Sequence, residues 1–469
     1  MREIVTLQLG HLSNYLATHF WNAQESYFTY GDGENPLVDH NVHWRAGIGH
    51  DGAETFLPRT VVYDLKGGSG QPAVHKQETV SPSAYQQSLD AGAEPPRPAP
   101  SAVRYWSDFS RVYLHPRSAV QLYDFELGSA VRPFERFAMG AELFASLDKD
   151  HDIVDRDWRP FVEECDAMQG IQVLTTLDDA WGGFSSSYLE ALRDEYPKSC
   201  IWVWGLQAPL LDVSRHQRQL RLVNTALSLS QSCSMASMVV PLAVPDAHAS
   251  PPLALDRRSP WHVSGLLSTA MESAALLSRL VALPGHRPTS LSDVAEGLNA
   301  SGRQTLVNAS MGVGARALDP DAEMMDCGLL HPGCGNAHGR RGRAFFGQMY
   351  TCRGAGADKD PVDHASGQAS RHNMGTPVIR SCNSPLLFPL LSSFPPLYPN
   401  ISAEGAAIPV RAVLSTDSSM SGRVKMLQSQ TCRLVTVEDR ETLSSGLMDI
   451  ADAYQHGWSS GSDEGDDDI

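Results

Sequence analysis

Residues 1–21, MREIVTLQLGHLSNYLATHFW, decide the fold. Glu3 to Gln8 is rich in apolar and β-branched residues, which predicts a buried strand. We expect a turn over Gly10 to Asn14 and a helix from Tyr15 to Trp21. Such a unit opens many nucleotide-binding α/β folds, because free backbone N–H groups at the helix start can face a phosphate. By itself this geometry is not specific, since many helices begin in this way and bind nothing.

The composition is that of an ordinary globular protein. The chain has 469 residues, enough for two or three domains, with 42% hydrophobic and 19% charged residues. A formal net charge of −17 argues against direct nucleic-acid binding, because phosphate contacts need clustered Lys and Arg. The 8 cysteines show no paired spacing, which predicts reduced thiols in a cytosolic setting. No apolar run reaches about eighteen residues, so we expect no transmembrane segment.

The first stretch resembles the N-terminus of tubulins. The residues in tubulin register are Met1, Arg2, Glu3, Ile4, Val5, Gln8, Gly10, Asn14, Phe20 and Trp21. Two positions depart, because His11 stands where tubulins carry Gln and Ser13 where they carry Gly. In keeping the tubulin scaffold residues while changing the nucleotide-facing loop, the sequence resembles the Misato family. These are tubulin-related proteins linked to mitochondrial and mitochondrial-DNA inheritance.

A second tubulin-like segment is FLPRTVVYDLKGGSG, residues 56–70. It predicts a strand ending at Asp64 and a glycine-rich loop that contains Gly67 and Gly68. By resemblance, Asp64 would lie near phosphates and hold Mg²⁺ through water. The alternative is that its carboxylate only caps the loop. The sequence leaves both roles open.

The loop at residues 177–184 is where tubulins place the glycine-rich sequence that wraps the phosphates, and here it reads LDDAWGGF. It keeps two glycines and adds two carboxylates and a tryptophan, namely Gly182, Gly183, Asp178, Asp179 and Trp181. Even screened like charges about 4 Å apart repel by roughly 1 kcal/mol, and a bulky indole restricts close approach of the backbone. A Mg²⁺ ion recruited by the carboxylates would reverse that sign. A helix over residues 185–196 is expected to follow.

Two later segments complete the comparison. Residues 220–229 match a tubulin segment whose Asn reads guanine, which here is Asn224. A core helix is predicted over residues 261–281, and tubulins have a base-contacting Asn near its start where this chain has Ser264. Tubulins then carry an Asn-x-Asp loop whose acid completes hydrolysis, whereas residues 283–288 read LPGHRP.

The resemblance thus implies at most a degenerate GTP site. Its candidate nucleotide contacts are Gln8, Gly10, His11, Ser13, Asn14, Asp64, Gly67, Gly68, Gly182, Gly183, Asn224 and Ser264. We predict no catalytic residue, no bound metal and no cofactor, GTP being the one ligand that the fold suggests.

Other motifs have less specific explanations. Cys327, His331, Cys334 and His338 have a zinc-like spacing but lie in one short loop, unlike separated zinc ligand pairs, so a mobile surface loop is favoured. The aromatic residues of the segment 101–133 are expected to pack in the core, not to form a ligand platform. Residues 384–399, apolar and interrupted by prolines, are expected to be a buried irregular segment more than a docking strip. The C-terminal strands and helix are expected at residues 345–353, 408–414, 431–437 and 438–457.

We therefore predict a tubulin-like α/β fold, a parallel sheet flanked by helices followed by a smaller mixed α/β region. The expected regions are 1–115, an N-terminal tubulin-like region; 116–305, the rest of the nucleotide domain; 306–455, the mixed region; and 456–469, an acidic tail.

Two functions compete. By resemblance, the first is a non-enzymatic protein of mitochondrial partitioning, distribution and morphology and mitochondrial-DNA inheritance, with protein partners at the mitochondrial surface or cytoskeleton. The second is a GTP-binding, filament-forming GTPase. Because Glu3 stands where a presequence should be basic, we expect a peripheral protein on the outer mitochondrial surface and in the cytoplasm.

Overall fold

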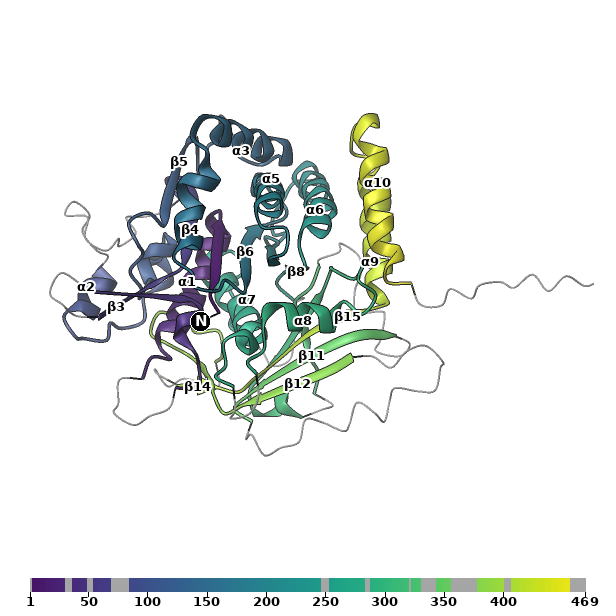
Figure 1. The fold of residues 1–469 in the computed structure, drawn as a ribbon. Helices are drawn as coiled ribbons and strands as arrows, with labels where there is room; N and C mark the ends of the chain where they lie inside the picture. Colours follow the sequence, from purple (N-terminus) through teal and green to yellow (C-terminus); the bar gives the residue numbers. More distant parts are fainter. Residues whose placement is uncertain are drawn as a thin grey trace, which may run out of the picture.

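The computed structural model describes residues 2–29, 36–48, 54–68, 84–245, 253–282, 287–319, 322–329, 343–355, 378–399 and 406–455. Its centre is a six-stranded sheet in which every neighbouring pair runs parallel (Figure 1). In spatial order the strands are β5 (Ala119–Glu126), β4 (Thr60–Lys66), β1 (Ile4–Leu9), β6 (Gly170–Thr176), β7 (Cys200–Leu206) and β8 (Met238–Leu242). This confirms the predicted parallel sheet, with the N-terminal strand at its centre.

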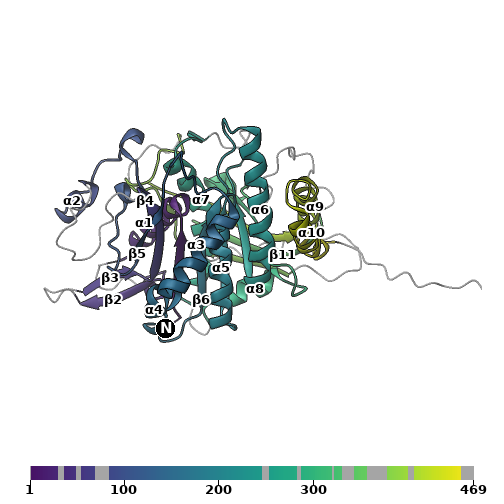
Figure 2. The same ribbon diagram turned by 90° about the horizontal axis from the view of Figure 1, so that it is seen from above.

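Helices cover both faces of this sheet (Figure 2). On one face lie α1 (His11–Glu25) and α7 (Pro260–Ala275). On the other lie α3 (Phe137–His151), α5 (Ala180–Glu195) and α6 (Arg215–Met235). Strands β1, β6, β7 and β8 are buried along their whole length, as the continuous apolar runs of central parallel strands require, whereas the edge strand β5 is only partly buried.

The second region is built on a mixed five-stranded sheet, as predicted. Its strands, in spatial order, are β10 (Met325–Asp326), β9 (Asn308–Val313), β15 (Val410–Asp417), β11 (Phe345–Arg353) and β12 (Val378–Ser384). Its helices are α8 (Leu291–Leu298), α9 (Ser419–Thr431) and α10 (Val437–Asp452). Helix α7 contacts β9, β11 and β15, so it lies between the two sheets.

Short elements connect these layers. They are η1 (His40–Val42), β2 (Trp44–Ile48), β3 (Glu54–Pro58), α2 (Ala84–Asp90), η2 (Pro100–Ala102), η3 (Trp106–Phe109), the π-helical turn η4 (Val154–Trp158), α4 (Arg159–Glu163), η5 (Leu276–Ser278), η6 (Ala315–Leu318), β13 (Phe388–Pro389) and β14 (Ala407–Ile408). Within the described ranges, no helix is long and apolar enough to cross a membrane.

The first helix packs as a core element. Leu16 and Phe20 are fully buried and Trp21 is almost so, while Leu12 is partly buried against the same cluster. The indole of Trp21 meets that of Trp44 edge to face, with the ring centroids 5.8 Å apart. Aromatic residues of this size dominate the packing energy of a core. The kept N-terminal residues thus serve the scaffold.

A buried ion cluster joins the two regions. Glu272 of α7 accepts hydrogen bonds from Arg353 of β11, from Arg279 at 2.5 Å and from the Tyr27 hydroxyl at 2.9 Å. Both arginines and the glutamate are fully buried. Removing one partner of such a pair is strongly destabilising, because it leaves an uncompensated buried charge. The cluster therefore fixes α7 against the second sheet.

Several predicted boundaries were wrong for local reasons. Helix α1 begins at His11, because Gly10 alone makes the turn with a positive φ of 91°. The strand predicted over residues 431–437 is instead the end of α9 and the start of α10, where the Thr436 side chain caps the helix by accepting from the Asp439 amide. A β-branched residue was mistaken there for a strand residue.

Of the remaining predictions from the sequence, the structure confirms some, contradicts one and does not describe the others. Strand β11 matches its prediction, and residues 384–399 are largely buried and irregular, as expected. Of the aromatic segment, Trp106, Phe109 and Phe125 are buried, whereas Tyr123 is 74% exposed. Cys327 is buried, which contradicts a surface position for that residue. The remaining three residues of the zinc-like motif, like the tail at 456–469, lie outside the described residues.

Candidate functional site

The carboxyl ends of β1 and β4 and the start of α1 bring seven predicted residues together. Gly10 caps α1 without a side-chain hydrogen bond, and its own amide donates to the Tyr63 carbonyl at 3.1 Å. The Ser13 hydroxyl donates back to the Gly10 carbonyl at 2.8 Å, so it is used within its own turn. In the tubulin-like comparison, this helix start is where phosphates would lie. The seven residues are Gly10, His11, Ser13, Asn14, Asp64, Gly67 and Gly68.

The indole of Trp181 lies against this turn. A Cβ atom built on Gly10 would be 2.5 Å from Cδ1 of Trp181, well inside van der Waals contact. Trp181 is only 3% exposed, and its ring meets those of Phe134 and Phe184 at centroid distances of 5.4 Å. Aromatic side chains thus fill the space between the first helix and the segment that replaces the tubulin glycine loop.

Asp64 is held by protein donors. Its carboxylate accepts from the Asn14 amide at 3.2 Å, from the Trp106 indole at 2.9 Å and from the Leu65 backbone at 2.9 Å. Nδ1 of His11 lies 3.8 Å from the same carboxylate. Bonds of this kind are expected of a carboxylate that caps a loop. The alternative role of Asp64, at a hydrated Mg²⁺, stays a prediction.

The conformation of the turn after β4 explains why residues 67 and 68 are both glycine. Gly67 has a positive φ of 80°, a conformation that favours glycine. At Gly68 an added Cβ would be 2.3 Å from Oδ1 of Asp64. Both glycines therefore shape the turn that holds the Asp64 carboxylate, whether or not a ligand approaches.

Gly182 and Gly183 lie inside α5, which begins at Ala180, five residues before the predicted start. A Cβ on Gly183 would be 1.9 Å from the Phe137 carbonyl oxygen of α3, and one on Gly182 would be 2.0 Å from Oγ of Ser228 in α6. These helices lie side by side in Figure 2. The two glycines permit close helix packing, and the prediction of an open loop at this point was wrong.

The remaining predicted contacts make internal hydrogen bonds. Asn224, 1% exposed, accepts from the Phe137 amide at 3.0 Å and donates to the carbonyls of Glu135 and Asp178 at 2.6 and 3.1 Å. Gln8 donates to the Thr60 hydroxyl at 2.8 Å within the sheet. Ser264 is fully buried in α7 and donates to the Trp261 carbonyl at 3.2 Å.

Two carboxylates, the buried Asp178 and the partly buried Asp179, lead into α5. Asp179 accepts from the Thr176 hydroxyl at 2.5 Å and caps α5 through the Trp181 amide at 2.9 Å. Asp178 accepts from the Ala208 amide at 3.1 Å and lies 3.9 Å from Arg221. Burial, and then repulsion from Asp179, raises the pKa of Asp178 to about 7. Burial likewise raises the pKa of Asp179 to about 6, against its hydrogen bonds with Thr176 and Trp181.

A nucleoside triphosphate does not fit these residues. The indole of Trp181 takes the space beside Gly10, and the phosphate-wrapping loop of tubulins is replaced by a capped helix start with two carboxylates. Within the described residues, no three His, Cys, Asp or Glu side chains are grouped to hold a metal ion. Sequence reasoning missed Trp106 and Phe134 in this arrangement, although the aromatic-rich composition of residues 101–134 was the available signal.

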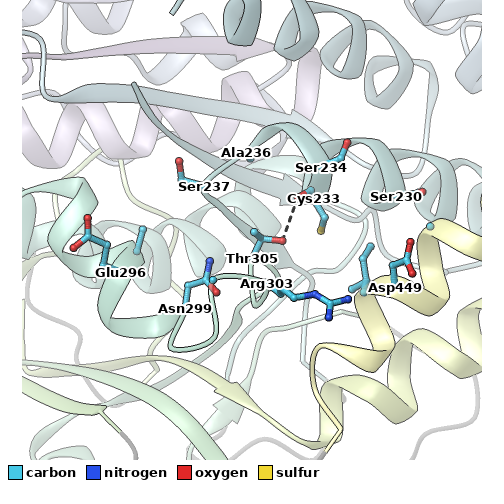
Figure 3. A pocket seen from close by; sticks show the side chains of 14 residues that line it. Ser230, Cys233, Ser234, Ala236, Ser237, Glu296, Asn299, Arg303, Thr305 and Asp449 are labelled. Carbon is cyan, nitrogen blue, oxygen red and sulfur yellow. Dashed lines mark hydrogen bonds between the residues drawn. The ribbon is translucent and has the colours of Figure 1, made fainter. Parts of the chain in front are cut away.

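A separate cavity of about 660 Å³ lies between the end of α6, α8 and α10 (Figure 3). It is lined by hydroxyl and charged side chains that include Glu296, Arg303 and Asp449. None of the predicted nucleotide contacts lines it. The cavity is therefore not a displaced version of the tubulin-like site.

Comparisons with known proteins agree with the fold. Residues 95–280 match the family model described as a tubulin domain, and residues 2–90 match the Misato Segment II tubulin-like domain. The class is therefore a tubulin-like protein. Over the full length of both chains, the sequence is 52% identical to Protein DML1 of Gibberella zeae and 43% identical to Protein dml-1 of Neurospora crassa. It is also 30% identical to Protein dml1 of Schizosaccharomyces pombe, over 66% of this chain and 72% of the relative. The chain belongs to the Misato family, together with these DML1 proteins.

Proposed function

We propose that the chain is a non-enzymatic tubulin-like protein that acts in mitochondrial partitioning, mitochondrial distribution and morphology, and mitochondrial-DNA inheritance. The main support for the non-enzymatic part is that the Trp181 indole lies against Gly10, at the turn that binds the phosphates in tubulins. Asn224 supports it, because its side-chain amide is already bonded to the backbone groups of Phe137, Glu135 and Asp178. On this proposal the candidate nucleotide contacts are a remnant of a GTP site, in which the Trp181 indole occupies the space beside Gly10.

The direct test is a titration of the purified chain with a fluorescent GTP analogue, together with a phosphate-release assay. We expect neither saturable binding up to about 1 mM, the weak end of ordinary ligand affinities, nor turnover above the buffer rate. The predicted reason for the missing turnover is the absence of an Asn-x-Asp sequence after α7. Turnover at a tubulin-like rate, in protein free of contaminating GTPases, would refute the proposal.

A GTP-binding, filament-forming GTPase is the second candidate. Its support is that Gly10 leaves the first turn of α1 without a side-chain cap, as anion-binding helix starts require. Light scattering and sedimentation with and without GTP distinguish the two. GTP-dependent assembly that disappears with GDP would favour this second function over the first.

The mitochondrial part rests on the resemblance to the Misato family. Cells that lack the chain should lose mitochondrial DNA and show abnormal mitochondrial distribution, and the intact gene should restore both. Unchanged mitochondrial DNA content in the deletion, measured by quantitative PCR over many divisions, would contradict it. The partners are proposed to be proteins of the mitochondrial surface or the cytoskeleton, without direct nucleic-acid contact.

We further propose that the chain is peripheral to mitochondria and also cytoplasmic. The support for this position is the resemblance to the Misato family. Protease added to intact mitochondria should digest the associated protein while a matrix marker survives. Full protection with an intact outer membrane would exclude a peripheral position. The boundaries near residues 115, 305 and 455 remain predictions, to be tested by limited proteolysis.

A further inference from the structure

The two edges of the six-stranded sheet differ. At one edge, Val239 of β8 exchanges backbone hydrogen bonds of 2.8 Å with Thr305 and Val307, which cover the strand. At the other edge, β5 pairs with β4 alone among the residues that the structure describes. Figure 1 shows β5 on the side of the molecule away from α10, where α2 and β3 also lie. An edge strand that stays uncovered presents a row of backbone groups on which another chain can pair.

The register fixes which groups of β5 face outward. The Val62 amide donates to the Ser118 carbonyl at 2.7 Å, and Val62 stands opposite Ala119. Because backbone direction alternates along a strand, Ser118, Val120 and Leu122 direct their N–H and C=O groups toward β4. The outward groups are then those of Ala119, Gln121 and Tyr123. They form a short, regular ledge of alternating donors and acceptors.

A hollow of about 650 Å³ runs beside this ledge. It is lined by Arg117, Ala119, Val120, Gln121, Arg156 and Asp157. The Arg156 guanidinium is paired with Asp157, through two hydrogen bonds of 2.7 Å. The Arg117 guanidinium is exposed, and the described part of the chain gives it no ion-pair partner. Two guanidiniums and one carboxylate leave one positive charge beside the ledge, in a chain whose net charge is −17.

The ledge ends at a defined point. After Leu122 the pairing with β4 slips, so that Lys66 stands opposite Glu126 and the residues between bulge. This turns Phe125 into the core and leaves Tyr123, 74% exposed, at the end of the ledge. Bulges limit how long a strand can pair. The available edge therefore suits a short extended segment better than a second long strand.

We propose that the β5 edge docks a short extended segment of a partner protein, which pairs with Ala119, Gln121 and Tyr123 and places a carboxylate against Arg117. Main-chain hydrogen bonds would supply affinity, and the charge beside the ledge would supply specificity. Docking here does not depend on whether the chain binds GTP, so the two tests can fail separately.

The probe is a fluorescein-labelled octapeptide, Val-Glu-Val-Thr-Val-Glu-Val-Thr, with a twin in which both glutamates are lysine. Binding to the full chain is followed by fluorescence anisotropy up to about 1 mM peptide. We expect the glutamate peptide to bind at least about tenfold more tightly than the lysine twin. Residue-resolved hydrogen exchange should show new protection at Ala119, Gln121 and Tyr123, whereas Val120 and Leu122 are already protected by β4.

Two pairs of variants check the contacts. Gln121→Pro removes one outward donor without touching the ladder to β4, and should weaken binding about tenfold, while Gln121→Ala should not. Arg117→Glu should also weaken it about tenfold, whereas Arg303→Glu, the same charge change at an exposed arginine of the distant cavity, should not. Equal binding of the two peptides, binding without protection of the outward amides, or no binding at all would each overturn the proposal.

Discussion

Replacing Trp181 with Ala tests whether an aromatic side chain has taken over the space beside Gly10. Trp181 is 3% exposed and lies between Gly10, Phe134 and Phe184, so its loss leaves a cavity that the surrounding helices cannot close. A buried Trp→Ala change costs about 3–5 kcal/mol. Total stability is on the order of 5–15 kcal/mol, so the free energy of unfolding should fall by a large fraction.

The assay is denaturant unfolding of parent and variant at equal protein concentration, with the midpoints compared at similar slopes. Tyr123→Ala is the matched control, because this aromatic ring is 74% exposed and its loss should change stability by less than about 0.5 kcal/mol. GTP should not stabilise the parent, although a ligand at a hundred times its Kd would add about 2.7 kcal/mol. A Trp181→Ala variant as stable as the parent, or a parent stabilised by GTP, would refute the reasoning.

Three further predictions concern the same scaffold. Trp21→Ala should lower the free energy of unfolding by about 3–5 kcal/mol and reduce the soluble yield, whereas His11→Gln should change that free energy by less than about 0.5 kcal/mol. Thermal melts in which His11→Gln is the less stable variant would contradict a kept scaffold with a changed loop. Gly183→Ala should destabilise the chain, because an added Cβ would meet the Phe137 carbonyl oxygen, whereas Gly422→Ala, in α9 with open space around it, should not. Circular dichroism melts compare the two variants, and a Gly183→Ala variant that melts with the parent would remove the packing argument. Because burial raises the pKa of Asp178 to about 7 and that of its neighbour Asp179 to about 6, the folded chain binds more protons than the unfolded one between pH 4 and 7. Stability should therefore fall as the pH rises through that window, and Asp178→Asn should flatten the fall; an identical pH slope in the variant would exclude Asp178 as its source.

The fold was largely predictable, because its main elements carry their own patterns. The apolar run of β1 and the spacing of α7 specify a buried strand and a core helix without reference to anything else. The wrong predictions concern local structure. Gly10, with its positive φ, makes in one residue the turn predicted over residues 10–14, and Thr436 caps a helix where the sequence predicts a strand. A cap or a turn depends on the backbone conformation of one residue, and the spacing of apolar residues along the sequence carries no information about that conformation.

The site was less predictable, because its outcome is decided by contacts between distant segments. The sequence indicated that Trp181 would hinder a close backbone approach, but not that the indole would lie against Gly10, which is some 170 positions earlier. Trp106 is a similar case, since its hydrogen bond to Asp64 joins residues 42 positions apart. No spacing rule relates such pairs; only the arrangement of β1, β4 and α5 around the start of α1 brings them together.

The residues that match the nucleotide-site motifs of tubulins share one property, which is that each of them supports the packing or hydrogen bonding of the fold. Those that still match tubulins and that we expected at a nucleotide all have a structural role here, namely Gln8, Gly10, Asn14, Asp64, Gly182, Gly183 and Asn224. In contrast, the residues that differ from tubulins are His11, Ser13 and Ser264. Asn224 joins the segments at Glu135 and Asp178 through its hydrogen bonds, whereas Ser13 and Ser264 donate to carbonyls three residues earlier in the chain. A residue kept only by contact with a ligand would be free to change in a chain that does not bind that ligand. Residues that also allow two helices to touch, or that join a loop to a helix, would still cost stability on replacement. A match to the tubulin motif in this chain therefore reports the demands of packing, and nucleotide binding has to be measured separately.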